Sequence, residues 1–181
     1  EKMDVFEAIN KRRSVRAYKS DPIPEDILKK VLDSMRQAPS AANRQPWKFI
    51  IIKDRALVES VVKACNAQTF LMQAPVVIAA CGIENQAWKG VGGNRSASAV
   101  EIDVSIAATH LTLAAAAEGL GTCWVGSFNE ACFKKMLKVP EGVRIVMLTP
   151  LGFPASPDLI HPLNPETRKD FNEIFCENYY A

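Results

Sequence analysis

The sequence predicts an α+β sandwich formed by a single domain over residues 1–181. Amphipathic helical stripes alternate with short, mostly apolar segments of the kind that form buried strands. The longest helical stretch, residues 96–118, is apolar on nearly every face, which places it at the centre of the fold or at a subunit interface. No G-x-G-x-x-G motif follows the first predicted strand, and this argues against a doubly wound dinucleotide-binding sheet.

Three elements are predicted at the N-terminal end. Val5, Phe6 and Ile9 form the inward stripe of a short helix. Residues 22–38 form the next helix, because their apolar side chains recur at helical spacing up to a proline stop. Residues 47–53 are mostly apolar and predict a strand that is buried on both faces.

A second helix and strand follow. Asp54 is placed to cap a helix, and residues 74–81 form the second buried strand. Residues 82–95 contain four glycines and predict a mobile loop. Trp88 and Arg95 in this loop are exposed candidates for covering a ligand.

The long helix over residues 96–118 leads into the last part of the sheet. Its expected inward face consists of Val100, Val104, Ala107, Ala108, Leu111 and Ala115. Asp103 and His110 share a face and form either a polar relay or a mutually satisfied structural pair. Residues 121–126 predict a short strand and turn, after which Asn129 caps another helix.

The C-terminal part begins with a strand over residues 143–151. Residues 152–165 contain four prolines and predict a tail that runs over the surface. Beyond the tail, Phe171, Ile174 and Phe175 lie on a short helix and need an apolar partner surface, which a second subunit would supply.

Composition and charge exclude several classes of function. Hydrophobic residues make up 48% of the chain and charged residues 23%, the mix of an ordinary globular protein. The net charge of +2 is too small to predict nucleic-acid or anionic-membrane binding. We find no apolar signal core and no apolar run of transmembrane length, so we expect a cytoplasmic protein without a membrane partner.

The cysteines and histidines predict no metal centre. Five cysteines are scattered without a CxxC pair, and Cys65, Cys81 and Cys123 lie in apolar runs. We expect these three to be reduced core residues, as in a reducing cytosol. His110 and His161 are far apart in sequence and show neither HExxH nor Cys/His ligand spacing.

Arginine occupies the positions where the inward stripe of the first helix would continue. Residues 12, 13 and 16 are all Arg, and an unpaired buried charge costs several kcal/mol or more. Guanidinium groups match phosphate with bidentate donors. The cluster therefore indicates either a phosphate-bearing ligand or a solvated charge run at a helix end. Because acid, base and nucleophile groups are scarce, we expect a cofactor to supply the chemistry.

Two stretches carry a resemblance to a known family. RRSVR at residues 12–16, followed by PSAANRQPW at residues 39–47, resembles the FMN-dependent nitroreductase family. Supporting matches occur in the same order at APVVI (74–78), GLGTCW (119–124) and LGFP (151–154). The resemblance implies a central, mostly antiparallel sheet flanked by helices. It also implies an intertwined homodimer with two FMN sites at the interface.

The resemblance implies phosphate and ring-edge contacts from the N-terminal cluster, namely Arg12, Arg13, Ser14 and Arg16. Arg16 would lie near the pyrimidine edge, where positive charge stabilises the anionic reduced flavin. Arg168 resembles a late basic residue that clamps the phosphate; the alternative for Arg168 and Lys169 is a solvated helix start. A second basic residue is common two positions earlier in the family, but this chain has Glu166 there.

Further implied contacts surround the flavin ring. Asn66 or Gln68 resembles a polar contact to the pyrimidine ring. Val125, Gly126 and Ser127 match a turn whose backbone N–H points at ring nitrogen N5, which takes the hydride. For Gly126, the alternative is an ordinary turn glycine.

Contacts from the other subunit are implied for Pro39, Ser40, Ala41 and Asn43. For the adjacent Gln45, Pro46 and Trp47, the alternative is a turn that simply leads the chain into the first strand.

The resemblance predicts an oxidoreductase that uses FMN and NADH or NADPH. The nicotinamide would reduce the flavin, leave, and be replaced by an electron-poor acceptor such as a nitroaromatic or quinone, in a ping-pong sequence. Two alternatives on the same fold are reductive dehalogenation and flavin destruction. A flavin-binding or storage module without turnover is a third alternative. A basic nucleic-acid binder is a fourth, disfavoured by the near-neutral charge.

Overall fold

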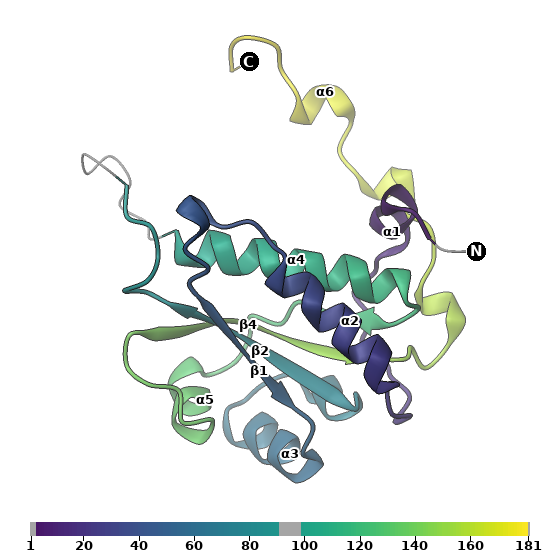
Figure 1. Ribbon diagram of the computed structural model, residues 1–181. Coiled ribbons are helices and arrows are strands. Elements are labelled where there is room, and N and C mark those ends of the chain that lie inside the picture. The colour runs from purple at the N-terminus through teal and green to yellow at the C-terminus, as the bar shows by residue number, and fades with distance from the viewer. Residues whose placement is uncertain (1–2, 91–98, 181) are drawn as a thin grey trace.

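The computed structural model describes residues 3–90 and 99–180, which form a layered α+β sandwich (Figure 1). Within these residues, four antiparallel strands form the middle layer in the order β1-β2-β4-β3. The strands are β1 (Trp47–Ile52), β2 (Val76–Ile83), β3 (Gly121–Thr122) and β4 (Val143–Gly152). The predicted α+β class with an antiparallel sheet is therefore confirmed, and the third predicted strand is shorter than expected.

Helices cover both faces of the sheet, with α2 and α4 on one side and α3 and α5 on the other (Figure 1). The helices are α1 (Val5–Lys11), α2 (Glu25–Arg36), α3 (Arg55–Ala64), α4 (Val100–Ala117), α5 (Glu130–Met136) and α6 (Phe171–Ile174). The two predicted caps are confirmed. Asp54 accepts the N–H groups of Ala56 and Leu57, and Asn129 accepts that of Cys132.

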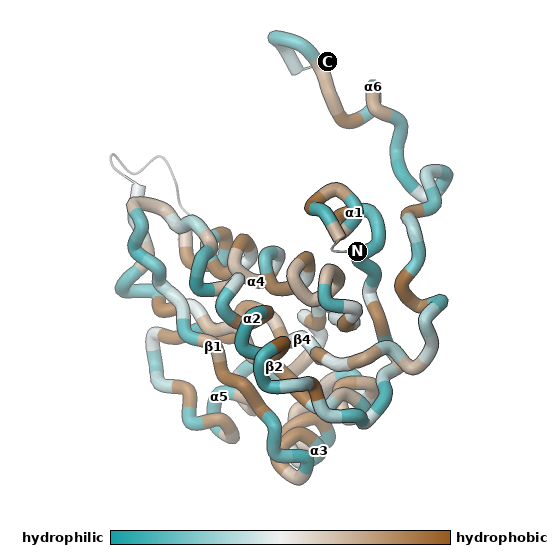
Figure 2. Tube along the Cα trace, turned by 45° about the vertical axis from the view of Figure 1, so that its right-hand side comes forward, coloured by the Kyte–Doolittle hydropathy of each residue, from teal (hydrophilic) through white to brown (hydrophobic). Residues whose placement is uncertain are grey.

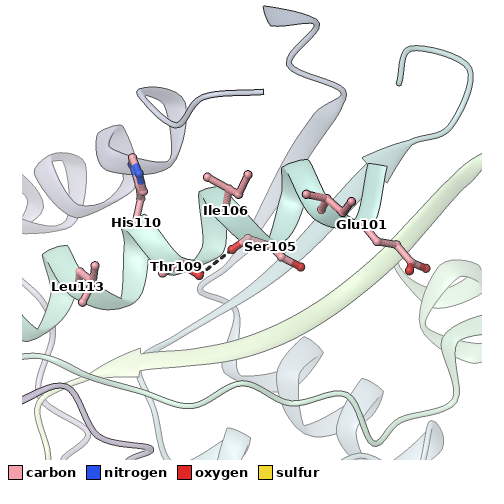
Figure 3. Close-up of a pocket in the computed structure, with 7 residues that line it drawn as sticks. Glu101, Ser105, Ile106, Thr109, His110 and Leu113 are labelled. Atoms are coloured by element: carbon pink, nitrogen blue, oxygen red, sulfur yellow. Dashed lines mark hydrogen bonds between the residues drawn. The ribbon is translucent and has the colours of Figure 1, made fainter. Parts of the chain in front are cut away.

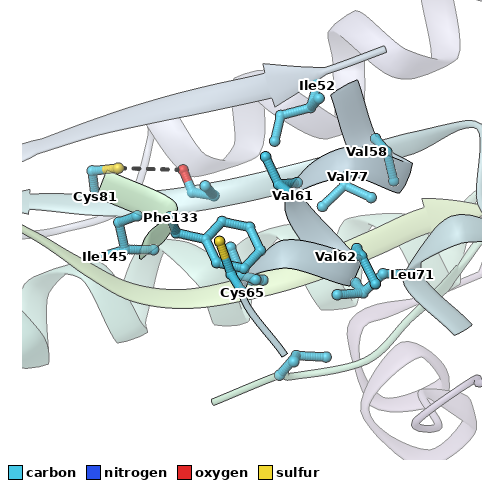
Figure 4. Packing of buried hydrophobic residues seen from close by; sticks show 13 residues of the cluster. Ile52, Val58, Val61, Val62, Cys65, Leu71, Val77, Cys81, Phe133 and Ile145 are labelled. Carbon is cyan, nitrogen blue, oxygen red and sulfur yellow. Dashed lines mark hydrogen bonds between the residues drawn. The ribbon is translucent and has the colours of Figure 1, made fainter. Parts of the chain in front are cut away.

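Apolar side chains fill the space between the layers. Under α3 and α5, Phe133 is 1% exposed and lies beside Cys65 and Ile145 in the centre of one cluster (Figure 4). A second cluster joins the other sheet face to α2 and α4. The predicted inward residues of α4 are all buried, so this prediction is confirmed.

Helix α4 also corrects one expectation. By length and composition it could cross a membrane, although we expected no apolar run of that length. Half of its 18 residues are buried inside the structure, and a helix in the core of a protein can be equally long and apolar.

The two polar residues expected on one face of α4, Asp103 and His110, do not pair with each other. Asp103 Oδ1 accepts the Ala41 N–H at 3.0 Å, and His110 Nδ1 lies 3.2 Å from the Ser34 carbonyl oxygen.

The prediction that the apolar stripe of α1 faces inward is wrong for the single chain. Val5, Phe6 and Ile9 are 60%, 78% and 54% exposed, and Ala8 is the buried residue of this helix. The face that turns toward the body carries the small Ala8 rather than the large apolar side chains. The stripe therefore faces outward and forms an unpartnered apolar surface.

The prediction for Cys65 is also wrong, because Cys65 forms a disulfide with Cys132. The end of α3 packs against α5, which brings the two Cα atoms to 5.3 Å although they are 67 residues apart. Cys81 and Cys123 are free and buried, as predicted. The disulfide removes cysteine usage as an argument for a reducing compartment.

The loop predicted over residues 82–95 is only partly described. Its first two residues belong to β2, Trp88 is half-buried rather than exposed, and Arg95 lies outside the described residues. The proline-rich tail runs over the surface for most of its length, as expected. Beyond it, α6 stands away from the body in both views (Figures 1 and 2).

Candidate functional site

A cleft of about 530 Å³ lies between the N-terminal arginines and the C-terminal tail. It is lined by Arg12, Arg13, Ser14, Asp158, Leu159, His161, Leu163, Asn164, Thr167 and Arg168. Burial, and the charges of Arg12 and Arg168, lower the pKa of Arg13. Three guanidinium groups therefore lie close enough to repel one another, and an anion in the cleft would relieve that repulsion.

These guanidiniums differ in how far they are already engaged. Arg13 donates to the carbonyl oxygens of Arg12 and Asn10, so part of its capacity is used by the backbone. The side chains of Arg12 and Arg168 make no hydrogen bond or ion pair within residues 3–90 and 99–180. The carboxylate of Asp158 at the cleft is engaged by the Ser156 hydroxyl. The cleft thus fits a phosphate group, with Arg12 and Arg168 as its free cations.

Backbone pairing positions the arginine segment against the end of the sheet. Ser14 bridges Thr122, and the Val15 N–H donates to the Thr122 carbonyl oxygen at 2.9 Å. The buried Tyr18 hydroxyl donates to the Val15 carbonyl oxygen at 2.5 Å, and burial raises the pKa of Tyr18. Arg16 is exposed, with its Nη1 at 3.5 Å from the Ser14 carbonyl oxygen.

A glycine allows this close pairing. A Cβ at Gly121 would lie 2.8 Å from the Cβ of Val15, which no packed side chain tolerates. We expect Gly121→Ala to lower the free energy of unfolding by about 1–3 kcal/mol through overpacking. Urea denaturation measures this effect, and Gly126→Ala is the matched control, because a Cβ at Gly126 meets nothing within 4 Å. Equal stability of the two variants would contradict the packing shown for Val15.

Two segments with implied ring contacts also lie together. Asn66 and Gln68 are exposed after α3, and the Asn129 N–H donates to the Cys65 carbonyl oxygen at 2.9 Å. The segment of residues 65–68 is thereby held next to the end of the 125–127 turn.

Hydrogen bonding within the turn restricts which amide can serve the flavin. Val125 is buried, and its N–H already donates to the Leu148 carbonyl oxygen at 2.9 Å. The exposed Gly126 and Ser127 have N–H groups without a partner in the described part of the chain. Of the three residues implied at N5, only Gly126 and Ser127 therefore retain a free amide donor.

The loop over residues 39–46 does not join this cluster in the same chain. Ala41 is bound to Asp103 near the N-terminal end of α4, whereas Ser14 pairs with Thr122 beyond the C-terminal end. At a rise of about 1.5 Å per residue, the two ends of the 18-residue α4 are roughly 25 Å apart. On one chain, the arginine cluster therefore lies at the opposite end of α4 from the loop residues implied to contact the flavin, which are Pro39, Ser40, Ala41 and Asn43.

Several residues at the cleft were not predicted from the sequence. Cys123 does not line the cleft, but this buried thiol lies near the arginine segment: burial raises its pKa, while Arg16, Ser14 and Arg12 act in the opposite direction. The signal available in the sequence was its place in GLGTCW (119–124), one of the stretches that carry the family resemblance. For His161, Asn164 and Thr167 no local pattern exists, because the tail reaches the cleft through long-range contacts.

Comparisons with known proteins bear on the family and the fold. The model of the nitroreductase family matches residues 9–69 and 58–153. The NADH dehydrogenase of Thermus thermophilus is 30% identical, over 84% of this chain and 88% of its own length. The FMN reductase [NAD(P)H] of Bacillus subtilis is 24% identical, over 95% of this chain and 74% of its own length. The crystal structure of a nitroreductase family protein from Clostridium difficile 630 superposes with a TM-score of 0.86 at 28% identity, covering 98% of this chain and 100% of that one.

Proposed function

This chain belongs to the nitroreductase family and is an NAD(P)H-dependent flavin oxidoreductase with FMN as its cofactor, and we propose that its acceptor is an electron-poor molecule such as a nitroaromatic or quinone. We further propose that the nicotinamide and the acceptor bind one after the other in the same cleft at the flavin ring, which is distinct from the arginine-lined cleft for the phosphate. The structural observation that supports the cofactor is the arginine cluster, in which Arg12 and Arg168 lack a carboxylate partner among the described residues.

The residues present divide the work of holding such a cofactor. Arg12 and Arg168 would bind the phosphate, while Arg13 keeps the end of α1 in place through its backbone contacts. Gly126 and Ser127 would direct their free N–H groups at the ring. When bound, FMN would supply the redox chemistry by taking a hydride at N5 and passing electrons to the acceptor. The protein binds, orients and shields it.

We also propose that two chains build each site. The arginine cluster and the loop over residues 39–46 lie at opposite ends of α4, so one flavin cannot reach both on a single chain. If two α4 helices pack antiparallel about a two-fold axis, the loop of one chain meets the cluster of the other. This arrangement agrees with the contacts implied for Ser40 and Asn43.

The unpartnered apolar surfaces support such a dimer. A hollow of about 630 Å³ runs along the outer side of α4, where Ile106 and Leu113 project from the helix (Figure 3). Phe171, Ile174 and Phe175 are 72%, 58% and 58% exposed on a segment that stands off the body (Figure 2). Exposed apolar surface on this scale marks an interaction site, and a partner chain would cover it.

Steady-state kinetics test the proposed reaction sequence. With one shared cleft, NADH or NADPH must leave before the acceptor binds, so rates obey a ping-pong law. We expect parallel lines in double-reciprocal plots against the nicotinamide at several fixed concentrations of a quinone. Intersecting lines would show that both substrates are bound together and would rule out the shared cleft.

A further inference from the structure

Asp103 is a buried carboxylate in an otherwise apolar setting. It lies in the first turn of α4 and is 2% exposed, and among residues 3–90 and 99–180 it is the one charged side chain buried to this degree. Removing a carboxylate from water is costly, and the positive end of the helix offsets only part of that cost. For packing alone, burying an apolar residue of similar size would cost less free energy.

One hydrogen bond of its side chain connects α4 to a distant part of the chain. Oδ1 accepts the N–H of Ala41 at 3.0 Å, across 62 residues of sequence. Oδ2 is buried and has no hydrogen-bond partner in the described structure. Buried polar atoms are almost always paired, so an unpaired Oδ2 makes Asp103 a costly residue at this position, and the bond to Ala41 is the one contact that sets it apart from an apolar side chain among the described residues.

The loop that Asp103 holds is strained. Ala42, Asn43 and Gln45 all have a φ of 51°, the left-handed region that residues other than glycine adopt only when their surroundings enforce it. Within the loop, the Ser40 hydroxyl accepts the Gln45 N–H at 2.9 Å. At its far end, the Ile83 N–H donates to the Pro46 carbonyl oxygen at 2.8 Å.

These contacts leave the first half of the loop anchored to the core through Asp103. Figure 1 shows the loop between α2 and β1 beside the N-terminal end of α4, where this bond is made. Without an acceptor for its N–H, Ala41 would be free to leave α4, and the strained residues after it would relax.

We propose that Asp103 is a positioning residue, whose buried side-chain oxygen, as the hydrogen-bond acceptor of Ala41, fixes the loop over residues 39–46 in the conformation that meets the flavin held by a second chain. The role in flavin binding rests on the function proposed above. Asp103 itself touches neither substrate nor cofactor. It acts through the backbone of Ala41, next to Ser40 and Asn43.

Two substitutions separate the carboxylate's roles. Asp103→Asn keeps an acceptor for Ala41 and removes the charge, whereas Asp103→Leu keeps the approximate size and removes the acceptor. Thr112→Val is the matched control, because Thr112 is also 2% exposed on α4 and, among the described residues, its hydroxyl bonds only within the helix, to the Thr109 carbonyl oxygen at 2.9 Å.

The first readout is amide hydrogen exchange of residues 39–46 in cofactor-free protein. We expect Asp103→Leu to speed exchange at Ala41 by about tenfold or more, since the protecting bond is gone. Asp103→Asn and Thr112→Val should leave this exchange unchanged. The second readout is the FMN dissociation constant, which we expect to rise about tenfold in Asp103→Leu and in neither of the other variants.

Two results would overturn the proposal. One is an Asp103→Leu protein whose loop exchange and FMN affinity match those of Thr112→Val, which would make Asp103 an ordinary buried residue. The other is an Asp103→Asn protein that behaves like Asp103→Leu, which would make charge rather than the acceptor decisive. A wild-type protein without FMN affinity would defeat the proposed function instead, and the exchange comparison would still decide whether Asp103 fixes the loop.

Discussion

Replacing Arg12 with alanine is expected to weaken FMN binding by about tenfold or more, because hydrogen bonds to a charged group contribute roughly 1.5–3 kcal/mol. Arg12 is the informative choice among the neighbouring arginines. Its guanidinium has no partner in the described residues, while Arg13 already donates to two backbone carbonyl groups. Arg12→Ala should therefore lose affinity for the phosphate with little loss of stability.

Titration of FMN into cofactor-free protein measures this change, and urea denaturation checks that the variant is folded. Arg36→Ala is the control, since Arg36 lies on α2, outside the cleft, and pairs with Asp33. The control should bind FMN as the wild type does. If Arg12→Ala also keeps the wild-type affinity, then the arginine cluster is solvated surface charge and the phosphate site lies elsewhere.

The second large effect is expected in mixed dimers. One chain carries Arg12→Ala and the other Asn43→Asp, and differently tagged chains allow the heterodimer to be purified. Asn43 has a φ of 51°, which Asp also tolerates, so this substitution adds a negative charge beside an anion site without changing the backbone. If each site uses Arg12 of one chain and Asn43 of the other, both lesions fall on one site.

The heterodimer should then recover about half of the wild-type activity, because one of the two symmetry-related sites is intact. Both homodimers must be measured at an FMN concentration below the dissociation constant of Arg12→Ala, where each is expected to be nearly inactive. Activity in the heterodimer no higher than in the homodimers would mean that each chain builds its own site.

Local sequence patterns were sufficient for much of the fold. The caps at Asp54 and Asn129 and the inward face of α4 follow from side-chain spacing and short-range hydrogen bonds, and the structure confirms them. The stripe of α1 has the same kind of pattern, yet it faces outward. Apolar periodicity indicates that a face needs a partner, without saying whether the partner belongs to the same chain.

Contacts between distant segments could not be predicted. Cys65 and Cys132 are 67 residues apart, and no spacing rule connects them. The bond between Ala41 and Asp103 spans 62 residues, so the sequence offered only a choice between a relay and a structural pair for Asp103 and His110. On one side of the cleft, the clustering of the arginines in the sequence was sufficient to suggest an anion site. The tail side depends on Leu163, whose N–H donates to the Asn10 side-chain oxygen at 2.7 Å across 153 residues.

Anaerobic titration of the FMN-loaded protein with NADH and with NADPH is the most direct test of an FMN-dependent oxidoreductase. We expect at least one nicotinamide to bleach the yellow absorbance of the bound flavin, and a quinone added afterwards to restore it. A protein that binds FMN but is bleached by neither nicotinamide would be a flavin-binding module without turnover, and this result would contradict the proposed function.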